Sequence, residues 1–350
     1  MREATLHRQD GTLARELLLE QAPLVGGVLL LGYFAAQLQH GFVPGELAWP
    51  LAGVRVPVWQ VVWMGMWTGY AMALVGQAAG VLALPYTTSV LHFSSAHVSP
   101  STLVLTLLNP VGALIGFHRS GQWNLRFAAW LCAGGALGAL AGPFLRASLL
   151  ADADAFRLAL GIALVVVAAQ LLHKAIVGIR ARTAAPRPGV GAPARIETLA
   201  AHGLRLTIAY RGQQWSLNQS VLFLVGAAVG VISAALGLGG AFLIVPFLVV
   251  WYRLPLYVVP AATIPYAVVL SAVGLFAYCF LLPLAGRAPI QPEWSWGLFA
   301  AAGGIFGAWA AAKTQLYVPE SLLNALLGAV TGAAGLLYAV NYFFPLPFAI

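Results

Sequence analysis

The sequence predicts an all-α polytopic membrane protein, built from two inverted repeats that each contain a broken, re-entrant helix hairpin, with one extra N-terminal helix. Of the 350 residues, 61% are hydrophobic and only 8% are charged, whereas soluble domains carry about 25% charged residues. Apolar segments near the roughly 20 residues that cross a bilayer recur along the chain, for example at 126–145 and 322–340. A recurring glycine and proline pattern predicts the duplication.

The apolar segments divide the chain into an extra helix and two sets of five. The extra helix is expected at 23–39, and no small-residue cleavage site follows it, so we do not expect a removed signal peptide. The first set is 58–76, 78–93, 98–117, 126–147 and 155–173, and the second is 219–236, 240–252, 256–281, 295–312 and 322–340. The expected domains are an N-terminal tail and helix at 1–57, a first repeat at 58–173, a linker at 174–215 and a second repeat at 216–350.

The evidence for duplication is an ordered set of matching residues. Gly65, Gly69, Gly76, Pro85 and Thr102 recur 161 residues later as Gly226, Gly230, Gly237, Pro246 and Thr263. A second match, between "AGGALGAL" at 133–140 and "AGGIFGAW" at 302–309, has an offset of 169 residues because a loop between the matches is longer. The glycines of this second match favour close helix packing. Ordered matches with one loop-sized shift indicate an internal duplication.

Charge placement predicts the topology. The linker holds seven of the eighteen Lys and Arg residues, and its end, "LRLTIAYRGQQWSL", alternates with period two around Arg211 and Gly212, which predicts a small β-hairpin outside the membrane. With the N-terminus and linker cytoplasmic, fourteen basic residues lie inside; outside lie only Arg55, Arg146, Arg157 and Arg287, as the positive-inside rule prefers. Five segments per copy is an odd number, so the copies are expected to be inverted, as in secondary transporters.

Composition argues against several function classes. The basic residues lie between apolar segments, which indicates membrane topology and no nucleic-acid partner. Cys132 and Cys279 lie in apolar segments without metal-ligand spacing, so neither a metal site nor a disulfide is expected. No cofactor is expected, because the glycines lack the strand–helix alternation of a dinucleotide site. All ten Asp and Glu residues fall in predicted tails or loops, so we expect no carboxylate within the membrane for a proton relay.

The stretch "GLGGAFLIVP" at 237–246 predicts the functional site. Glycine costs about 1 and proline about 3 kcal/mol relative to alanine inside a helix, so a turn followed by a short helix is expected. The first N–H groups of a helix lack partners and carry about half a positive charge. Where such a helix start faces a protein-lined cavity near the midplane, it can bind an anion. The counterpart in the first copy is "GQAAGVLALP" at 76–85, where Gln77 adds an amide donor.

Uncharged polar side chains complete the candidate site, since hydroxyl and amide donors suit an oxyanion. Each is explained at least as well by packing or by a bond to a helix carbonyl. Asn109 precedes Pro110, whose missing N–H frees a carbonyl one turn back, so it is also explained as the cap of a kink. The candidate substrate-binding residues are Gly76, Gln77, Gly80, Tyr86, Thr102, Asn109, Gly237, Gly239, Gly240 and Thr263.

Three stretches resemble the sulfite exporter TauE/SafE family of anion permeases. They are "GAAVGVISAALGLGGAFLIVPFLV" at 226–249, "VPAATIPYAVVLSAVG" at 259–274 and "SPSTLVLTLLNPVGALIGFHRSGQWN" at 99–124. The resemblance covers about 58–345 without the linker. Its motif falls on Gly237, Gly239, Gly240, Pro246 and Thr263, and in the first copy on Gly76, Gly80, Pro85 and Thr102. Here "GQAAG" replaces a glycine-richer turn, which leaves the two halves of the site chemically unequal.

The resemblance implies a transporter, usually an exporter, of sulfite, sulfonates, sulfoacetate or related sulfur-containing and organic anions. The expected location is the bacterial inner membrane. The expected partners are a small anion and the lipid bilayer, and whether the protein forms a homo-oligomer is left open. The alternative is a membrane-embedded enzyme that acts on a sulfur compound or a lipid. We expect no enzyme, because the apolar segments show no cluster of nucleophile, acid–base pair or metal ligands. A purely structural membrane subunit also stays open.

Overall fold

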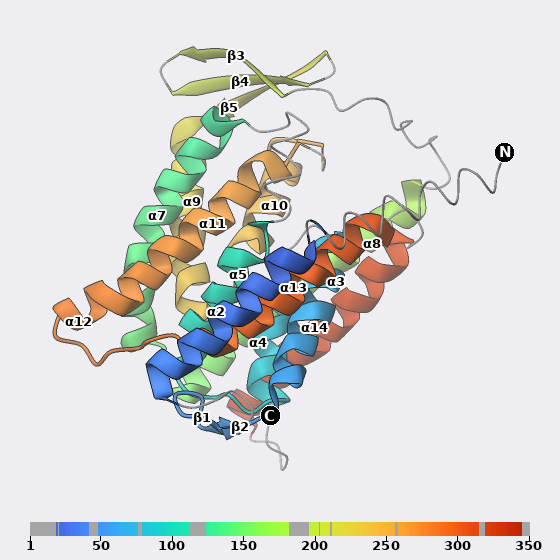
Figure 1. The fold of residues 1–350 in the computed structure, drawn as a ribbon. Coiled ribbons are helices and arrows are strands. Elements are labelled where there is room, and N and C mark those ends of the chain that lie inside the picture. Colours follow the sequence, from blue (N-terminus) through green and yellow to red (C-terminus); the bar gives the residue numbers. More distant parts are fainter. Residues whose placement is uncertain are drawn as a thin grey trace.

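The computed structural model describes residues 19, 21–41, 48–75, 79–111, 124–181, 196–202, 204–210, 212–255, 258–314 and 319–344. Figure 1 shows a bundle of long helices, with a small β-sheet at one end and a β-hairpin at the other. Six of the described helices are long and apolar enough to cross a membrane. The predicted all-α polytopic membrane architecture is therefore confirmed.

The helices follow the predicted order. The extra helix is α2 (Ala22–His40). The first predicted copy contains α3 (Val58–Val75), α4 (Gly80–Ser89), α5 (Val98–Leu108), α7 (Leu125–Ala147) and α8 (Ala153–Ala181). The second contains α9 (Gln219–Leu236), α10 (Ala241–Val250), α11 (Pro260–Phe276), α13 (Trp294–Thr314) and α14 (Glu320–Phe343). A π-helical segment, η2 (Ala277–Leu281), and α12 (Leu282–Leu284) continue α11.

The largest differences from the predicted helix ends lie at the ends of α5 and α8. The helix expected at 98–117 ends at Leu108, just before Pro110, because proline disfavours helical backbone at the residue before it and has no N–H to donate. Residues 112–117 lie outside the described ranges. Helix α8 continues eight residues past the predicted end at 173. Its last part is formed by the residues that the sequence assigned to the start of the linker.

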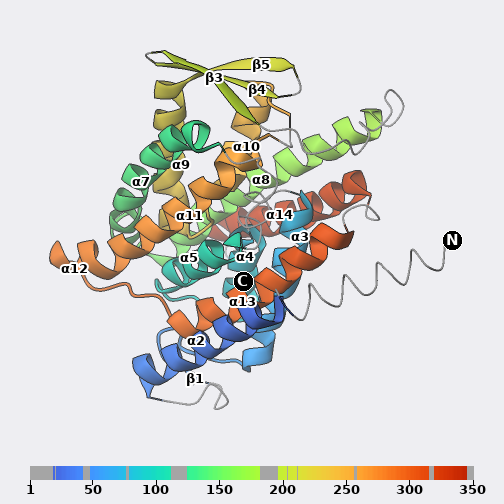
Figure 2. The same ribbon diagram turned by 45° about the horizontal axis from the view of Figure 1, so that its top comes forward.

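The linker folds into a three-stranded antiparallel sheet of β3 (Glu197–His202), β4 (Arg205–Tyr210) and β5 (Gln213–Asn218). The predicted hairpin is the β4–β5 pair, in which Tyr210 is opposite Gln213, whereas β3 was not predicted. Figure 2 shows this sheet beyond the ends of α7 and α9. The side chains of Asn124 and Asn218 cap the starts of those two helices. At the opposite end, β1 (Ala48–Trp49) pairs with β2 (Val54–Arg55).

Glycine-lined helix pairs form the centre of the bundle. Gly65 and Gly69 of α3 lie against Ala300 and Gly304 of α13, so these two helices run parallel. In the same way, Gly134 and Gly138 of α7 lie against residues 223 and 227 of α9. An added Cβ at Gly65 would lie 1.8 Å from the carbonyl oxygen of Ala300. The predicted packing role of the second glycine match is therefore confirmed.

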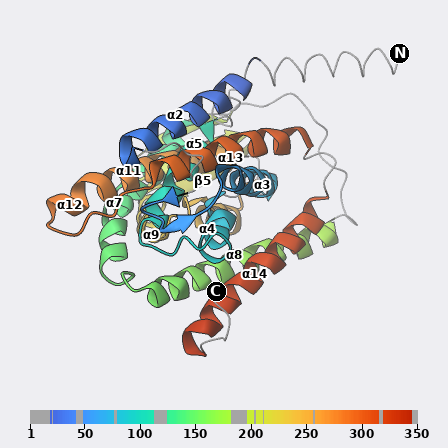
Figure 3. The same ribbon diagram turned by 60° about the horizontal axis from the view of Figure 1, so that its bottom comes forward.

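The contacts between the two predicted copies are reciprocal. The first helix of each copy packs on the fourth helix of the other, as α3 on α13 and α9 on α7. The third helices, α5 and α11, pack together, and so do the fifth helices, α8 and α14. Gly161 lies against Gly335, while Gly328 lies against Leu172, so α8 and α14 run antiparallel. Figure 3 shows α8 beside α14 and α3 beside α13.

The position of Arg146 differs from the prediction. The sequence placed it among the loop charges, but it lies in the last turn of α7 and is only 2% exposed. Its guanidinium donates to the carbonyl oxygen of Leu150 and lies 4.3 Å from the centre of the Phe156 ring. The side chain therefore turns inward and packs against the connection between α7 and α8. An arginine in this position says little about topology, because its charge is not presented by a loop.

Candidate functional site

The start of α4 and the turn before α10 lie against each other. A Cβ atom added to Gly80, the first residue of α4, would lie 3.0 Å from the carbonyl oxygen of Gly237 and 3.1 Å from that of Leu238. Gly80 and residues 236–241 are all buried. The short helices of the two predicted copies therefore begin at one place inside the protein. We call Gly80 and residues 237–240 the glycine junction.

The backbone of residues 237–240 requires glycine at three positions. Gly237, Gly239 and Gly240 have φ angles of 86°, 82° and 75°, a left-handed region that other L-residues rarely adopt. Gly237 ends α9, with its N–H donating to the carbonyl of Ser233 at 2.8 Å, and Gly240 is the N-cap of α10. The sequence predicted a tight turn followed by a short helix, and both are present.

Neighbouring helices leave no room for side chains at the junction. A Cβ at Gly237 would lie 2.6 Å from the carbonyl oxygen of Ser99, next to the start of α5. A Cβ at Gly240 would lie 2.6 Å from Cε1 of Tyr266 on α11. The Tyr266 ring is held in place because its hydroxyl donates to the carbonyl of Gly226 at 2.8 Å. The third helices of both copies therefore pack directly around the two helix starts.

Hydroxyl groups line this region. Thr106 Oγ1 of α5 and Ser271 Oγ of α11 are 2.9 Å apart, which links the third helices of the two copies. The methyl group of the same threonine would lie 2.8 Å from a Cβ at Gly80. Ser233, one turn before the junction, is fully buried, and its hydroxyl has no hydrogen-bond partner among the described residues. The sequence identified Thr106 and Ser271 only as polar residues at depth, and nothing local showed that they meet.

Two predicted site residues use their hydroxyls within their own helices. Thr102 Oγ1 donates to the carbonyl of Val98 at 2.9 Å, and Thr263 Oγ1 donates to that of Val259 at 3.3 Å. Both threonines are only 5% exposed. This bonding to the carbonyl four residues earlier is the ordinary use of threonine in a helix. Neither hydroxyl needs a ligand to be satisfied.

The remaining predicted residues have mixed positions. The Tyr86 ring packs edge-on against Trp67, with centroids 5.4 Å apart. Asn109 follows the last residue of α5, and its Oδ1 is buried without a partner among the described residues. An added Cβ at Gly304 of α13 would lie 3.0 Å from that oxygen. Gly76 and Gln77 lie outside the described residues.

A separate groove of about 370 Å³ lies between α7 and α11, lined by residues that include Leu125, Cys132 and Val268. The lining side chains are aliphatic, apart from the thiol of Cys132. An anion would find no hydroxyl, amide or cationic donor there, and loss of its hydration would be costly. This groove is therefore a poor anion site compared with the glycine junction.

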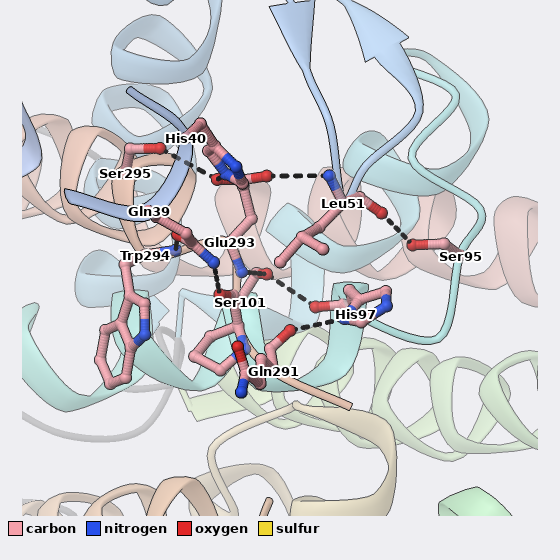
Figure 4. A network of polar contacts seen from close by, with 11 residues as sticks. Gln39, His40, Leu51, Ser95, His97, Ser101, Gln291, Glu293, Trp294 and Ser295 are labelled. Atoms are coloured by element: carbon pink, nitrogen blue, oxygen red, sulfur yellow. Dashed lines mark hydrogen bonds and ion pairs between the residues drawn. The ribbon is translucent and has the colours of Figure 1, made fainter. Parts of the chain in front are cut away.

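One polar cluster was not predicted. Glu293 lies in the loop directly before α13, as the sequence predicts, but it is 0% exposed. Its carboxylate oxygens lie near His40 at the end of α2, Leu51 in the β1–β2 hairpin and Ser295 at the start of α13 (Figure 4). Sequence reasoning missed this burial because its loop neighbours look exposed, and the residues that cover it are about 250 positions away.

Together these features define a class of protein: a multi-helix membrane protein with two short helices that start at one buried, glycine-built point. The model of the family described as Sulfite exporter TauE/SafE matches residues 61–338. The chain belongs to this family, and the resemblance seen in the sequence is confirmed. No curated protein and no solved structure matches the chain. Membership of this family makes the protein a membrane transporter of anions.

Proposed function

We propose that the protein exports small sulfur-containing or organic anions, such as sulfite, sulfonates or sulfoacetate, and that the anion binds at the glycine junction. The observation that carries this proposal is the contact of Gly80 with the carbonyls of Gly237 and Leu238. It brings the starts of α4 and α10 to one buried place. The positive ends of two helices attract a negative solute there without a lysine or arginine.

The hydroxyls around the junction supply further donors. Thr106 Oγ1 donates to the carbonyl of Leu103 at 3.1 Å, so Ser271 donates the bond between the two hydroxyls. A hydroxyl can redirect its one hydrogen, so Ser271 can exchange this bond for one to an oxyanion. Ser233 has an unused hydroxyl close to the turn. A pyramidal sulfite or a tetrahedral sulfonate group presents three oxygens in different directions, which suits donors that come from α5, α9 and α11.

We also propose that the two copies are inverted, with the N-terminus and the linker cytoplasmic in a bacterial inner membrane. The antiparallel α8 and α14, which are equivalent fifth helices, support the inversion. The equivalent third helices support it too, since Thr106 lies at Ser271 while Leu103 lies at Gly274. Inverted repeats place a substrate site between them near the midplane. Export of an anion from a negative-inside cell is favoured by about 2.3 kcal/mol per charge per 100 mV.

A flux assay with a matched pair of glycine variants tests this site. Purified protein in liposomes should pass labelled sulfite and sulfoacetate, and the flux should respond to an imposed membrane potential. Gly240→Ala should lower the flux about tenfold or more, because the strain of a left-handed alanine, about 1–2 kcal/mol, is joined by the contact with Tyr266. Gly286→Ala is the control, because Gly286 has a φ of 72° with no atom within 4 Å of an added Cβ.

A second variant separates loss of binding from loss of folding. Ser271→Ala removes a hydroxyl but no packing volume beyond one oxygen, so the protein should stay folded while sulfite flux falls. Unchanged flux in both Gly240→Ala and Ser271→Ala would contradict the proposed site. No observation on the described residues favours the membrane-embedded enzyme.

A further inference from the structure

The buried carboxylate of Glu293 is held by groups from three elements. His40 Nε2 of α2 lies 2.6 Å from Oε1, and the hydroxyl of Ser295 donates to the same oxygen at 3.1 Å. The backbone N–H of Leu51, in the β1–β2 hairpin, donates to Oε2 at 3.2 Å. An ionised carboxylate only accepts hydrogen bonds, so this set of donors suits the charged form of Glu293. Figure 4 shows the three groups converging on it.

His40 is the titratable group placed to exchange a proton with Glu293. Its side chain is 9% exposed, against 0% for the carboxylate. His97, before α5, has its Nδ1 at 2.7 Å from the carbonyl oxygen of Gln291 instead. The other charged or titratable side chains that these elements present in the described residues, Arg55, His92 and Arg287, are exposed. His40 is therefore the titratable side chain that these elements place in contact with the Glu293 carboxylate in the described residues.

The pair is connected to the glycine junction through α5. The backbone N–H of Glu293 donates to Ser101 Oγ at 2.8 Å, and that hydroxyl donates to the carbonyl of His97 at 2.6 Å. An added Cβ at Gly297 of α13 would lie 2.7 Å from the carbonyl oxygen of Ser101. Thr106, on the same helix five residues further, contacts Gly80 at the junction. A change in the pair therefore acts on the helix that carries part of the proposed anion site.

If the contact between His40 and Glu293 only held the helices together, it would not need charged side chains. Replacing a buried ion pair by apolar side chains is often neutral or stabilising, because taking both charges out of water is costly. Ionisable residues buried in membrane proteins most often serve ion pathways or proton relays. An imidazole is also the side chain whose charge ordinarily changes between about pH 5 and pH 8.

We propose that His40 and Glu293 form a proton-binding site that switches the anion path; this rests on the proposed function. With the proton bound, the pair is an imidazolium and a carboxylate. Without it, a neutral imidazole faces a buried carboxylate, and the site is more negative by one charge. That charge opposes the entry of an anion along α5. The anion path is therefore open when the proton is bound and closed when it is lost.

Flux measured against pH tests the switch. Sulfoacetate is the probe, because its charge stays constant between about pH 6 and pH 8, and the membrane potential is held fixed with potassium and valinomycin. The flux of the unmodified protein should rise about fivefold or more between pH 8 and pH 6, the smallest usual size of coupling between two sites. Sulfite is unsuitable here, since it takes up a proton in this range.

Two isosteric variants should act in opposite directions. Glu293→Gln keeps the shape of the side chain but removes its negative charge, so flux should be high and independent of pH. His40→Gln keeps a donor near the carboxylate but removes the titrating group, so flux should be low at every pH. His97→Gln is the control and should keep the normal pH profile. If both variants of the pair only lower the flux, or if Glu293→Gln keeps the normal pH profile, the switch is overturned.

Proton binding can also be measured without transport. Trp294 adjoins Glu293 in sequence, and Trp296 packs on Trp49 beside the β1–β2 hairpin. Tryptophan emission of the detergent-solubilised protein should therefore change between about pH 5 and pH 8, and this change should disappear in both Glu293→Gln and His40→Gln. An emission change that both variants retain overturns the proton site. If emission titrates as expected but no anion is transported, the proton site stands and the proposed function fails.

Discussion

The glycines of the junction, Gly80 in the first predicted copy and those of residues 237–240 in the second, are needed for different reasons. In the second copy, Gly237, Gly239 and Gly240 all have left-handed backbones. In the first, Gly80 opens a right-handed helix, and Ala79 before it has a φ of −56°. Glycine is needed at Gly80 for space, because the carbonyls of Gly237 and Leu238 are so close. Gly80 corresponds to Ala241 at the offset of 161 residues, and Gly76, the counterpart of Gly237, lies outside the described residues. The need for glycine is thus conformational at 237–240 and steric at Gly80.

The largest effect in this comparison is expected for Gly237→Ala. The alanine would need a φ of 86°, and its Cβ would lie 2.6 Å from a backbone oxygen of Ser99 that cannot move aside alone. The left-handed conformation costs about 1–2 kcal/mol, and the contact adds to it. We expect the yield of folded protein and the thermal unfolding temperature in detergent both to fall. Unfolding at the unmodified temperature would contradict the described turn.

A smaller and reversible effect is expected for Gly80→Ala. The closest atom to the new Cβ is the methyl carbon of Thr106, at 2.8 Å. Thr106→Ser removes that methyl group and keeps the hydroxyl, so the double variant should recover part of the stability and flux lost by Gly80→Ala, while the contacts with the carbonyls of Gly237 and Leu238 remain. A double-mutant cycle measures this coupling, expected at about 0.5–3 kcal/mol for residues in contact. Additive effects of the two substitutions would show that Gly80 and Thr106 are not energetically coupled.

Tyr86 and Tyr266, each of which directly follows a proline inside its helix, allow a third comparison. Tyr266→Phe leaves the Gly226 carbonyl without its 2.8 Å donor in a buried place, which should cost about 1–3 kcal/mol of stability. Tyr86→Phe keeps the ring contact with Trp67 and should change stability by less than about 0.5 kcal/mol. Chemical or thermal unfolding of both variants checks this difference. Equal losses would show that Tyr86 has a hydroxyl role that its ring packing does not explain.

The smallest effects are expected for Thr102→Val and Thr263→Val. Each hydroxyl bonds a carbonyl of its own helix, and valine fills nearly the same volume, so flux should stay within about twofold of the unmodified protein. Labelled sulfite flux measures this directly. A large loss of flux in either variant would indicate that the anion binds at that threonine and not at the glycine junction.

Local signals in the sequence predicted the helices and the turn. Glycine and proline mark helix ends through their own backbone limits, so the turn at 237–240 and the start of α10 could be inferred without tertiary information. Strand β3 was missed because "ETLAAH" has no clear alternation. The pairing of Thr106 with Ser271 was missed too, since it depends on how two helices 165 residues apart cross.

Burial of charged residues was the least predictable property. Glu293 and Arg146 lie where one helix meets a loop, and in sequence each looks like a solvent-exposed charge. Glu293 is covered by His40 of the extra helix, α2, and by Leu51 of the β1–β2 hairpin. What covers Arg146 includes Phe156 of the next helix. Exposure at a helix end is decided by distant packing partners, which the residue types around the charge do not encode.

The close pairs α3–α13 and α7–α9 have a mechanical consequence. In each pair, a helix of one predicted copy packs on a helix of the other. The glycine contacts are so close that the two helices have no room to slide past each other. The two predicted copies are therefore not the units that move as rigid bodies. Any motion that changes access to the proposed anion site must move blocks that each contain helices from both predicted copies.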